Sequence, residues 1–304
     1  MSHYLWGMPT EPRFINPLTD FGFKRLFGTE PSKEILRAFL NALLPERHQV
    51  ASLTLTNSER LGLSEIDRKA IFDVYCVGKN GERFIVELQK AHQRYFTDRS
   101  VFYSSFLIQS QGQKNEWNFK LAPIYTVCIL DFKIAGRQNH ADYRTLVELK
   151  DENGKVFFDK LKYIYLELPK FKKEEHELDT DLERWLYLLR NLWSMQEIPK
   201  LFPTEVVEDI KREAELSAMT RDERFAYEQA LKVERDLRNV MDYAVEEAAK
   251  KAAKKAAKEA TKAANIERTN SIARKLLAQG VEDEVILAAT GLSLAKLNEL
   301  RSIS

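Results

Sequence analysis

The stretch FDVYCVGKNGERFIVELQ, residues 72–89, predicts a β-hairpin, and its register decides which side chains share a face. Asn80-Gly81 is a strong local signal for a tight turn between two strands. A two-residue loop pairs Lys79 with Glu82, whereas a three-residue loop also takes in Lys79 and leaves Gly81 left-handed in a bulge. Because side chains alternate along a strand, the two registers place opposite sets of residues on each face.

The three-residue loop is the better fit, because it makes one face of the hairpin wholly apolar. Its apolar pairs are Phe72 with Leu88, Val74 with Val86 and Cys76 with Phe84. On the other face it sets Asp73 directly across from Glu87, with side chains about 5 Å apart. Gln89 follows two residues further along the same face. The sequence therefore predicts two carboxylates that face each other across the hairpin.

Two opposed carboxylates need a physical reason, since like charges across a ladder destabilise a sheet. One carboxylate can stay protonated because the other raises its pKa. Alternatively, a hard divalent cation such as Mg2+ lies between them, because that ion favours carboxylates, waters and phosphate oxygens. A third explanation is a solvated strand face on which nearby Arg or Lys side chains pair with both acids. The hairpin alone leaves all three explanations open.

The composition is that of an ordinary globular protein. Its 304 residues, 44% of them hydrophobic, can bury a sizeable core in two or three units. The 47 basic and 46 acidic residues nearly cancel, so any nucleic-acid affinity has to come from local patches. Cys76 and Cys128 lie in predicted strands and the five histidines are scattered, which argues against a disulfide framework or a zinc site.

The chain carries no sign of membrane insertion or export. Its amino terminus, MSHYLWGMPTEP, lacks a basic region followed by an apolar run, and no stretch approaches the length that spans a bilayer. We therefore expect a cytoplasmic protein with no membrane partner.

Helix and strand patterns alternate over the first part of the chain. Helices are expected at residues 31–44, where Pro45 ends the pattern, and from Thr97 or Asp98 to about Gly112. Strands are expected at the apolar run 122–132, in a hairpin that turns at Asn153-Gly154, and at residues 162–171. This order predicts a mixed α/β domain over residues 1–175.

From Asp179 onward we expect only helices. Residues 246–264, EEAAKKAAKKAAKEATKAA, repeat every four residues, so their lysines wind slowly around a helix. The segment is either a solvated spacer or a basic helix that lies along a phosphate backbone. We assign residues 176–265 to a helical extension and spacer, and residues 266–304 to a small helix-turn-helix-like module.

Four blocks of sequence in this order resemble the Rpn family of recombination-promoting nucleases, which are transposase-like members of the PD-(D/E)XK superfamily. They are FINPLTDFGFKRLFG (14–28), the FDV and VELQ segments of the hairpin, RSVFYSS (99–105) and LLAQGVEDEVILAATGLSLAKLNEL (276–300). The resemblance spans about residues 14–300. It implies a bacterial protein with a restriction-endonuclease-like mixed sheet flanked by helices, followed by an all-α C-terminal region.

The resemblance also implies DNA cleavage with Mg2+, or Mn2+ as a substitute, and gives individual residues a role. Asp73 matches the acid of the first hairpin strand and Glu87 the acid of the (D/E)-x-K element, so both are expected to hold the metal together with the main-chain carbonyl of Leu88. The lysine position holds Gln89, which the family often shows. A neutral amide can orient water but supplies no charge, so the metal has to lower the pKa of that water largely alone.

Other residues of the matching blocks have two possible roles. Asp20 is either a third acid near the metal or a helix N-cap. Lys24 is a candidate for contact with DNA, and so is Lys90, although Lys90 points to the opposite face of its strand. Arg99 and Tyr103, four residues apart on one helix face, either hold phosphate or brace the hairpin.

We therefore expect a Mg2+-dependent endodeoxyribonuclease that acts on double-stranded DNA, in recombination or against mobile or foreign DNA. The alternatives are a catalytically weakened DNA- or partner-binding protein on a nuclease core, and a toxin-like defence nuclease. In the C-terminal module, the last helix carries Lys296 and Arg301 against Glu299. Since this helix is only weakly basic, a homodimer contact is favoured over a reader of the DNA major groove.

Overall fold

The computed structural model describes residues 12–45, 49–56, 59–60, 70–91, 93–112, 118–137 and 139–302. The chain divides into two compact units, the first ending at Lys232 and the second beginning at Val233. Residues 1–11, on which the expectation of no export signal rests, lie outside the described residues. Within the described part, no helix is both long and apolar enough to cross a bilayer.

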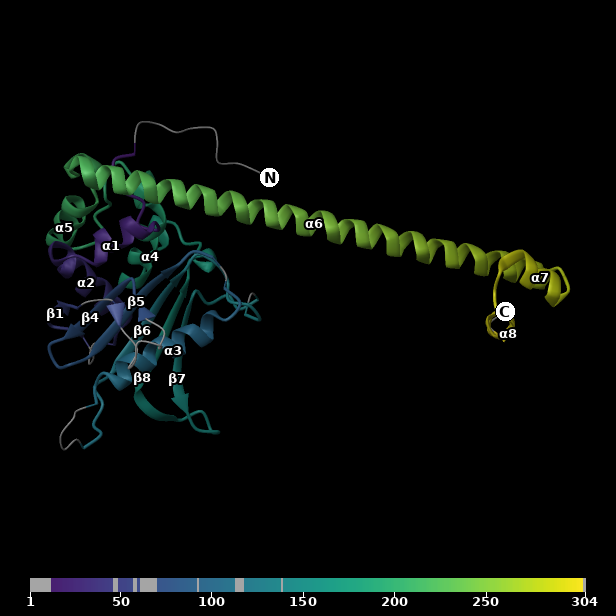
Figure 1. Cartoon of the computed structure of the whole chain (residues 1–304), viewed down its shortest axis with the longest axis horizontal. Helices are drawn as coiled ribbons and strands as arrows, with labels where there is room; N and C mark the ends of the chain where they lie inside the picture. Colours follow the sequence, from purple (N-terminus) through teal and green to yellow (C-terminus); the bar gives the residue numbers. More distant parts are fainter. Residues whose placement is uncertain are drawn as a thin grey trace. The chain divides into compact units, whose positions relative to one another are not determined.

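A six-stranded mixed sheet forms the centre of the first unit (Figure 1). In spatial order, its strands are β1 (Leu53–Leu55), β4 (Val74–Gly78), β5 (Arg83–Gln89), β6 (Ile124–Leu130), β8 (Val156–Glu167) and β7 (Arg144–Lys150). β6 runs parallel to both of its neighbours, β5 and β8, whereas the other pairs are antiparallel. Two short strands, β2 (Glu59–Arg60) and β3 (Ala70–Ile71), pair separately. This topology confirms the predicted α/β class.

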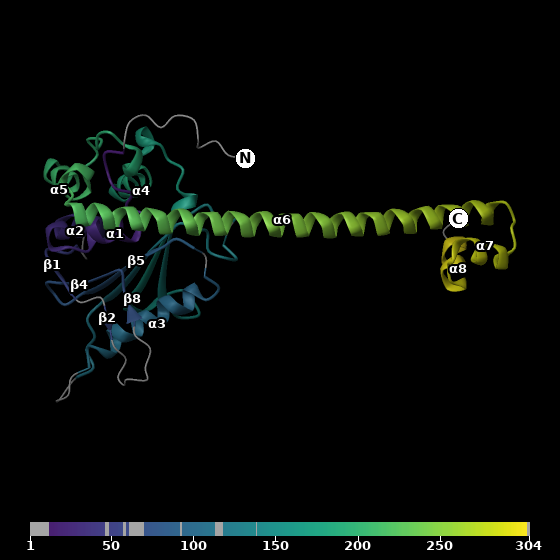
Figure 2. The same cartoon turned by 45° about the horizontal axis from the view of Figure 1, so that its top comes forward.

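Helices cover both faces of the sheet (Figure 2). One face packs against α1 (Asp20–Phe27), α2 (Lys33–Leu43), α4 (Asp181–Asn191) and α5 (Thr204–Ala214), which share a single core with the sheet. The other face packs against α3 (Phe96–Gln109). Strand β6 is buried along its whole length, as its continuous apolar run predicted.

The hairpin of β4 and β5 has the predicted register. Val74 pairs with Val86 and Cys76 with Phe84. The Gly78 N–H donates to the Glu82 carbonyl at 2.8 Å, which closes a three-residue loop. Gly81 has a φ of +88°, so it is the left-handed residue of that loop.

Replacing Gly81 with Val is therefore expected to destabilise the protein by about 1–2 kcal/mol, because a side chain disfavours the left-handed region. A Cβ atom at this position would meet only the Cβ of Ala122, at 3.7 Å, so crowding adds little. Asn80→Ala is the milder control, since it removes one exposed hydrogen bond from Asn80 Nδ2 to Glu82 Oε1, 3.1 Å long. Urea unfolding of both variants tests this, and equal stabilities would contradict the turn assignment.

Two local predictions were wrong in detail. The second strand of the second hairpin and the strand expected at residues 162–171 form one strand, the twelve-residue β8. The polar residues that interrupt the apolar pattern lie in the first half of β8, which is partly exposed to solvent, so they do not end the strand. Helix α3 begins at Phe96 and not at Thr97 or Asp98. Tyr95 precedes it without a side-chain cap, and buried Phe96 packs against Phe132 and Tyr165.

The helical extension does not separate from the α/β core. Trp185 of α4 and Ile210 of α5 are buried in the same core as Phe27 of α1. The compact units therefore divide within the segment predicted as residues 176–265, after Lys232. The three-domain division stays a prediction.

The second unit is entirely helical. It contains most of α6 (Arg221–Ala278) together with α7 (Asp283–Thr290) and α8 (Leu294–Ser302). Ala273, Ile286, Leu297 and Leu300 form its small core. The expected first helix of the module is the end of α6, because no Gly or Pro interrupts that helix before Gly280.

Candidate active site

The hairpin brings Asp73 and Glu87 together where the ladder of main-chain hydrogen bonds stops. Strand β4 begins at Val74, one residue after Asp73. The Leu88 N–H donates to Asp73 Oδ2 at 2.7 Å, and the Asp73 N–H donates to Glu87 Oε1 at 3.2 Å. Both carboxylates thus take the places that main-chain acceptors would fill. Among the described residues, the second oxygen of each carboxylate has no hydrogen-bond partner.

Phe72 departs from the predicted apolar face. It packs with Tyr103 of α3, at 5.4 Å between ring centroids, and not beside Val74 on the opposite side of the sheet. The chain bends at Asp73, so the strict alternation that placed Phe72 across from Leu88 no longer applies there. The bend directs Phe72 toward α3.

Burial and mutual repulsion shape the electrostatics of the acid pair. Burial raises the pKa of Asp73. Burial, and then the charge of Asp73, raise the pKa of Glu87 to about 8. The Glu87 side chain is nearly buried, and neither acid forms an ion pair with Lys or Arg among the described residues. The burial of Glu87 argues against a solvated face and favours protonation or a cation as the explanation for the pair.

Helix α3 places Arg99 beside the pair. Its Nη2 donates to Gln89 Oε1 and its Nη1 to Gln93 Oε1, the latter at 2.6 Å. Its Nε is buried and has no protein partner among the described residues. The guanidinium lies 5.5 Å from the ring centroid of Tyr103, and its charge lowers the pKa of both Asp73 and Glu87. Arg99 therefore braces the hairpin and adds positive charge to the site.

Gln89 is held at both ends of its amide. Its Oε1 accepts from Arg99, and its Nε2 donates to the Ala91 carbonyl at 3.1 Å. An amide engaged in this way is fixed in orientation. Its predicted role in orienting a water stays a prediction.

Helix α1, which packs against the face of the sheet that α3 does not cover, also contributes charged residues near the acid pair. Thr19, and not Asp20, is the N-cap, because Thr19 Oγ1 accepts from the Gly22 N–H at 3.0 Å. Asp20 pairs with Lys24 at 2.7 Å. The Lys24 charge lowers the pKa of Asp73 and the Asp20 charge raises it, so both lie near the acid pair.

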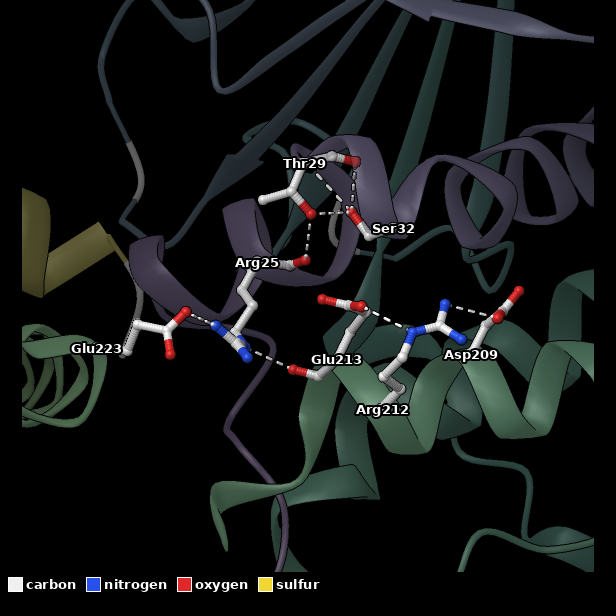
Figure 3. A network of polar contacts seen from close by, with 7 residues as sticks. All are labelled: Arg25, Thr29, Ser32, Asp209, Arg212, Glu213 and Glu223. Atoms are coloured by element: carbon white, nitrogen blue, oxygen red, sulfur yellow. Dashed lines mark hydrogen bonds and ion pairs between the residues drawn. The ribbon is translucent and has the colours of Figure 1, made fainter. Parts of the chain in front are cut away.

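Arg25 anchors this helix (Figure 3). Its Nε donates to the Glu213 carbonyl of α5 at 2.7 Å, and its Nη1 pairs with the Glu223 carboxylate at the start of α6. Since α5 packs in the same core, the helix that carries Asp20 and Lys24 is fixed relative to the sheet. Arg25 thus has a structural role within the amino-terminal block.

Lys90 lies apart from the acid pair. Its Nζ is 3.8 Å from Asp131 Oδ2. Lys90 is not among the main charges that shift the pKa of Asp73 or Glu87. Its predicted contact with DNA stays a prediction.

The donor set suits a hard cation that keeps some of its water. No group of three or more His, Cys, Asp or Glu side chains that could hold a metal occurs in the described part of the chain. Asp73 and Glu87 offer two adjacent carboxylates, and among the described residues each has an oxygen that lacks a hydrogen-bond partner. One or two carboxylates plus waters and substrate phosphates are what Mg2+ commonly takes in phosphate-processing sites.

Two comparisons with protein-family models place the chain. The model described as PD-(D/E)XK nuclease family transposase matches residues 17–244, and the Rpn/YhgA-like nuclease family C-terminal HTH domain matches residues 267–302. Searches of curated proteins and of solved structures gave no match. The first match covers well over half of the chain and includes both acids of the pair. The chain therefore belongs to the PD-(D/E)XK nuclease family transposases, and it carries the C-terminal helix-turn-helix domain of the Rpn/YhgA-like nucleases.

Proposed function

We propose that this nuclease-family protein is a Mg2+-dependent endodeoxyribonuclease that cuts double-stranded DNA during recombination or in mobile or foreign DNA. The observation that carries the proposal is the close pair formed by the partly buried Asp73 and the buried Glu87. Its two carboxylates have raised pKa values and no neutralising ion pair among the described residues. A divalent cation would remove the repulsion between them, and a metal-dependent nuclease uses such a cation to stabilise the charge that develops at the scissile phosphate.

Asp73, Glu87 and the main-chain carbonyl of Leu88 would hold the ion. When bound, Mg2+ polarises the phosphodiester and lowers the pKa of a water. The Leu88 N–H fixes the Asp73 carboxylate through Oδ2, and the Asp73 N–H fixes Glu87 through Oε1. This leaves Oδ1 and Oε2 for the cation. Because the pKa of Glu87 is raised to about 8, this carboxyl group would have to give up its proton at neutral pH to hold the ion.

Arg99 supplies the positive charge that a lysine at position 89 would otherwise provide. Gln89 then has a positioning role, because its amide is bonded to the guanidinium and to the Ala91 carbonyl. Among the described residues, the Arg99 Nε–H has no protein partner, and a donor left unpaired in a buried position is costly. A phosphate oxygen that accepts from this group would remove that cost and share the developing negative charge.

The buried acids argue against the alternative of a binding protein that has lost catalysis. Clustered carboxylates beside phosphates weaken DNA binding by repulsion, and burying them costs free energy. A toxin-like defence nuclease would use the same chemistry. Expression in a bacterial host separates the inactive binding protein from an active nuclease of either kind, because only an active enzyme is expected to cause DNA damage.

The direct test is cleavage of supercoiled plasmid DNA with Mg2+, Mn2+, Ca2+ or EDTA. We expect nicked and linear products with Mg2+ and Mn2+ only. Glu87→Gln is expected to lose this activity. Glu82→Gln, the same substitution at the exposed turn of this hairpin, is expected to keep it. Cleavage that continues in EDTA, or that survives Glu87→Gln, would refute the proposal.

A further inference from the structure

The lysines of the repeat in α6 lie on one side of the helix. The repeat carries Lys250, Lys251, Lys254, Lys255, Lys258 and Lys262. With 3.6 residues per turn, these six side chains fall within an arc of about 140°. The alanines between residues 248 and 264 occupy the opposite side, and every side chain of that stretch is exposed. The helix therefore has a lysine face, formed by these six residues, and an alanine face.

Most of the lysine face is not neutralised within the second unit. Lys250 pairs with Glu246 at 2.8 Å and Lys255 with Glu259 at 3.9 Å. Among the described residues, Lys251, Lys254, Lys258 and Lys262 make no ion pair. Steps of four residues separate the last three by about 6 Å along the axis. Like charges at this spacing destabilise a helix, so the arrangement favours an anionic partner.

The lysine face continues into the helix-turn-helix module. Lys258 and Lys262 line a shallow hollow of about 570 Å³ together with Thr261, Asn265, Ile266, Thr269 and Leu292. Leu292 lies in the loop just before α8, within the region matched by the helix-turn-helix domain. The hollow is mainly apolar, and the two lysines, two threonines and one asparagine add polar groups to its lining beside the module. Side chains of these types donate hydrogen bonds to phosphate oxygens in protein–DNA complexes.

We propose that the lysine face binds the phosphate backbone of double-stranded DNA, as a sequence-independent contact that extends the helix-turn-helix module along the duplex. Its uncompensated charge matches the closely spaced phosphates of a duplex. The alanine face lacks the Leu, Phe or Trp side chains that anchor an amphipathic helix in a membrane. Two copies would bring like-charged faces together without a large apolar seam to hold them. The proposal does not depend on cleavage.

The test is duplex binding by fluorescence anisotropy in EDTA over a range of salt concentrations. A variant with Lys251, Lys254, Lys258 and Lys262 all replaced by Gln is expected to bind at least tenfold more weakly at low salt. Each phosphate contact contributes about 0.9 to the slope of log K against log salt, so the slope is expected to shrink by about 3 to 4. Gln has nearly the helix propensity of Lys, and circular dichroism checks that the helix is kept.

Two control variants sharpen the result. The same four positions changed to Arg are expected to keep both affinity and salt slope, since charge is retained. Gln at Lys79, Lys155, Lys172 and Lys200, which are exposed in the first unit, makes the same change in net charge and is expected to change the slope little. An unchanged slope in the first variant, or an equal change in this control, would overturn the proposal. Loss of binding to anionic vesicles with intact DNA binding would assign the face to membranes and overturn it too.

Discussion

Replacing Asp73 with Asn is expected to abolish metal-dependent cleavage while leaving the metal-free protein at least as stable as the wild type. The amide oxygen can still accept from the Leu88 N–H, but the charge that repels Glu87 is gone. A catalytic metal contributes several kcal/mol, and about 1.4 kcal/mol is a factor of ten in rate, so we expect a loss of about a thousandfold or more.

The raised pKa of Glu87 also predicts how the stability of the metal-free protein changes with pH. The Glu87 pKa is raised from 4.5 to about 8, so between these pH values the native state binds more protons than the unfolded state. The free energy of unfolding therefore falls as pH rises through this window, and it is independent of this group below and above it. Asp73→Asn removes one cause of the raised pKa, so the fall is expected to be smaller.

Thermal denaturation from pH 4 to 9 without metal measures both effects. Asp159→Asn, at an exposed aspartate on β8, is the matched control and is expected to behave as wild type. Mg2+ is expected to raise the melting temperature of wild type and control but not of Asp73→Asn, since a ligand that binds only the native state stabilises it. A pair neutralised by neighbouring cations would behave in the opposite way, with Asp73→Asn destabilising and Mg2+ without effect.

Replacing Arg99 with Met is expected to lower kcat/KM for DNA cleavage by about a hundredfold, the effect of removing one donor to developing negative charge. Its charge also lowers the pKa of Glu87, so the activity profile is expected to move to higher pH. Arg94→Met is the control. Arg94 is exposed and its guanidinium lies over the ring of Tyr95, away from Gln89.

A second variant distinguishes the charge of Arg99 from its structural role in holding the hairpin. Gln89→Lys combined with Arg99→Met restores a positive charge at the lysine position of the superfamily, and we expect it to recover part of the lost activity. A purely structural Arg99 would give no such recovery, and its loss would lower the melting temperature. Wild-type cleavage by Arg99→Met would show that the guanidinium is not needed.

The sequence was sufficient to predict the hairpin and its acid pair. The turn at Asn80-Gly81 allowed two registers, the apolar face of the hairpin selected one of them, and that register brought Asp73 to Glu87. Only local information was needed, because the two residues belong to adjacent strands joined by a tight turn. The roles of these residues in metal binding stay predictions.

The surroundings of the pair depend on contacts that the local pattern does not encode. The bond between Arg99 and Gln89 joins α3 to β5, and the sequence offered Arg99 only as a candidate with two possible roles. Gln93, which holds the second arm of Arg99, was missed because it falls in no periodic pattern. Phe72 was misplaced because the bend at Asp73 interrupts the strand alternation.

In the helical regions too, the sequence predicted local structure but not tertiary contacts. Helix-forming composition was read correctly beyond Asp179, but composition does not say what a helix packs against. Helices α4 and α5 join the core of the first unit through Trp185 and Ile210, which set their position by tertiary packing. The segregation of lysines and alanines on α6 follows from the helical geometry of the repeat once its uninterrupted course is known.

We propose that Asp73 and Glu87 bind a divalent cation in place of a proton. Titration calorimetry of Mg2+ into the protein at pH 7, in buffers with different ionisation enthalpies, counts the protons released on binding. With the Glu87 pKa at about 8, we expect one bound ion and release of close to one proton per chain, and no binding to Asp73→Asn. Absence of Mg2+ binding, or binding without proton release that persists in Asp73→Asn, would contradict the account.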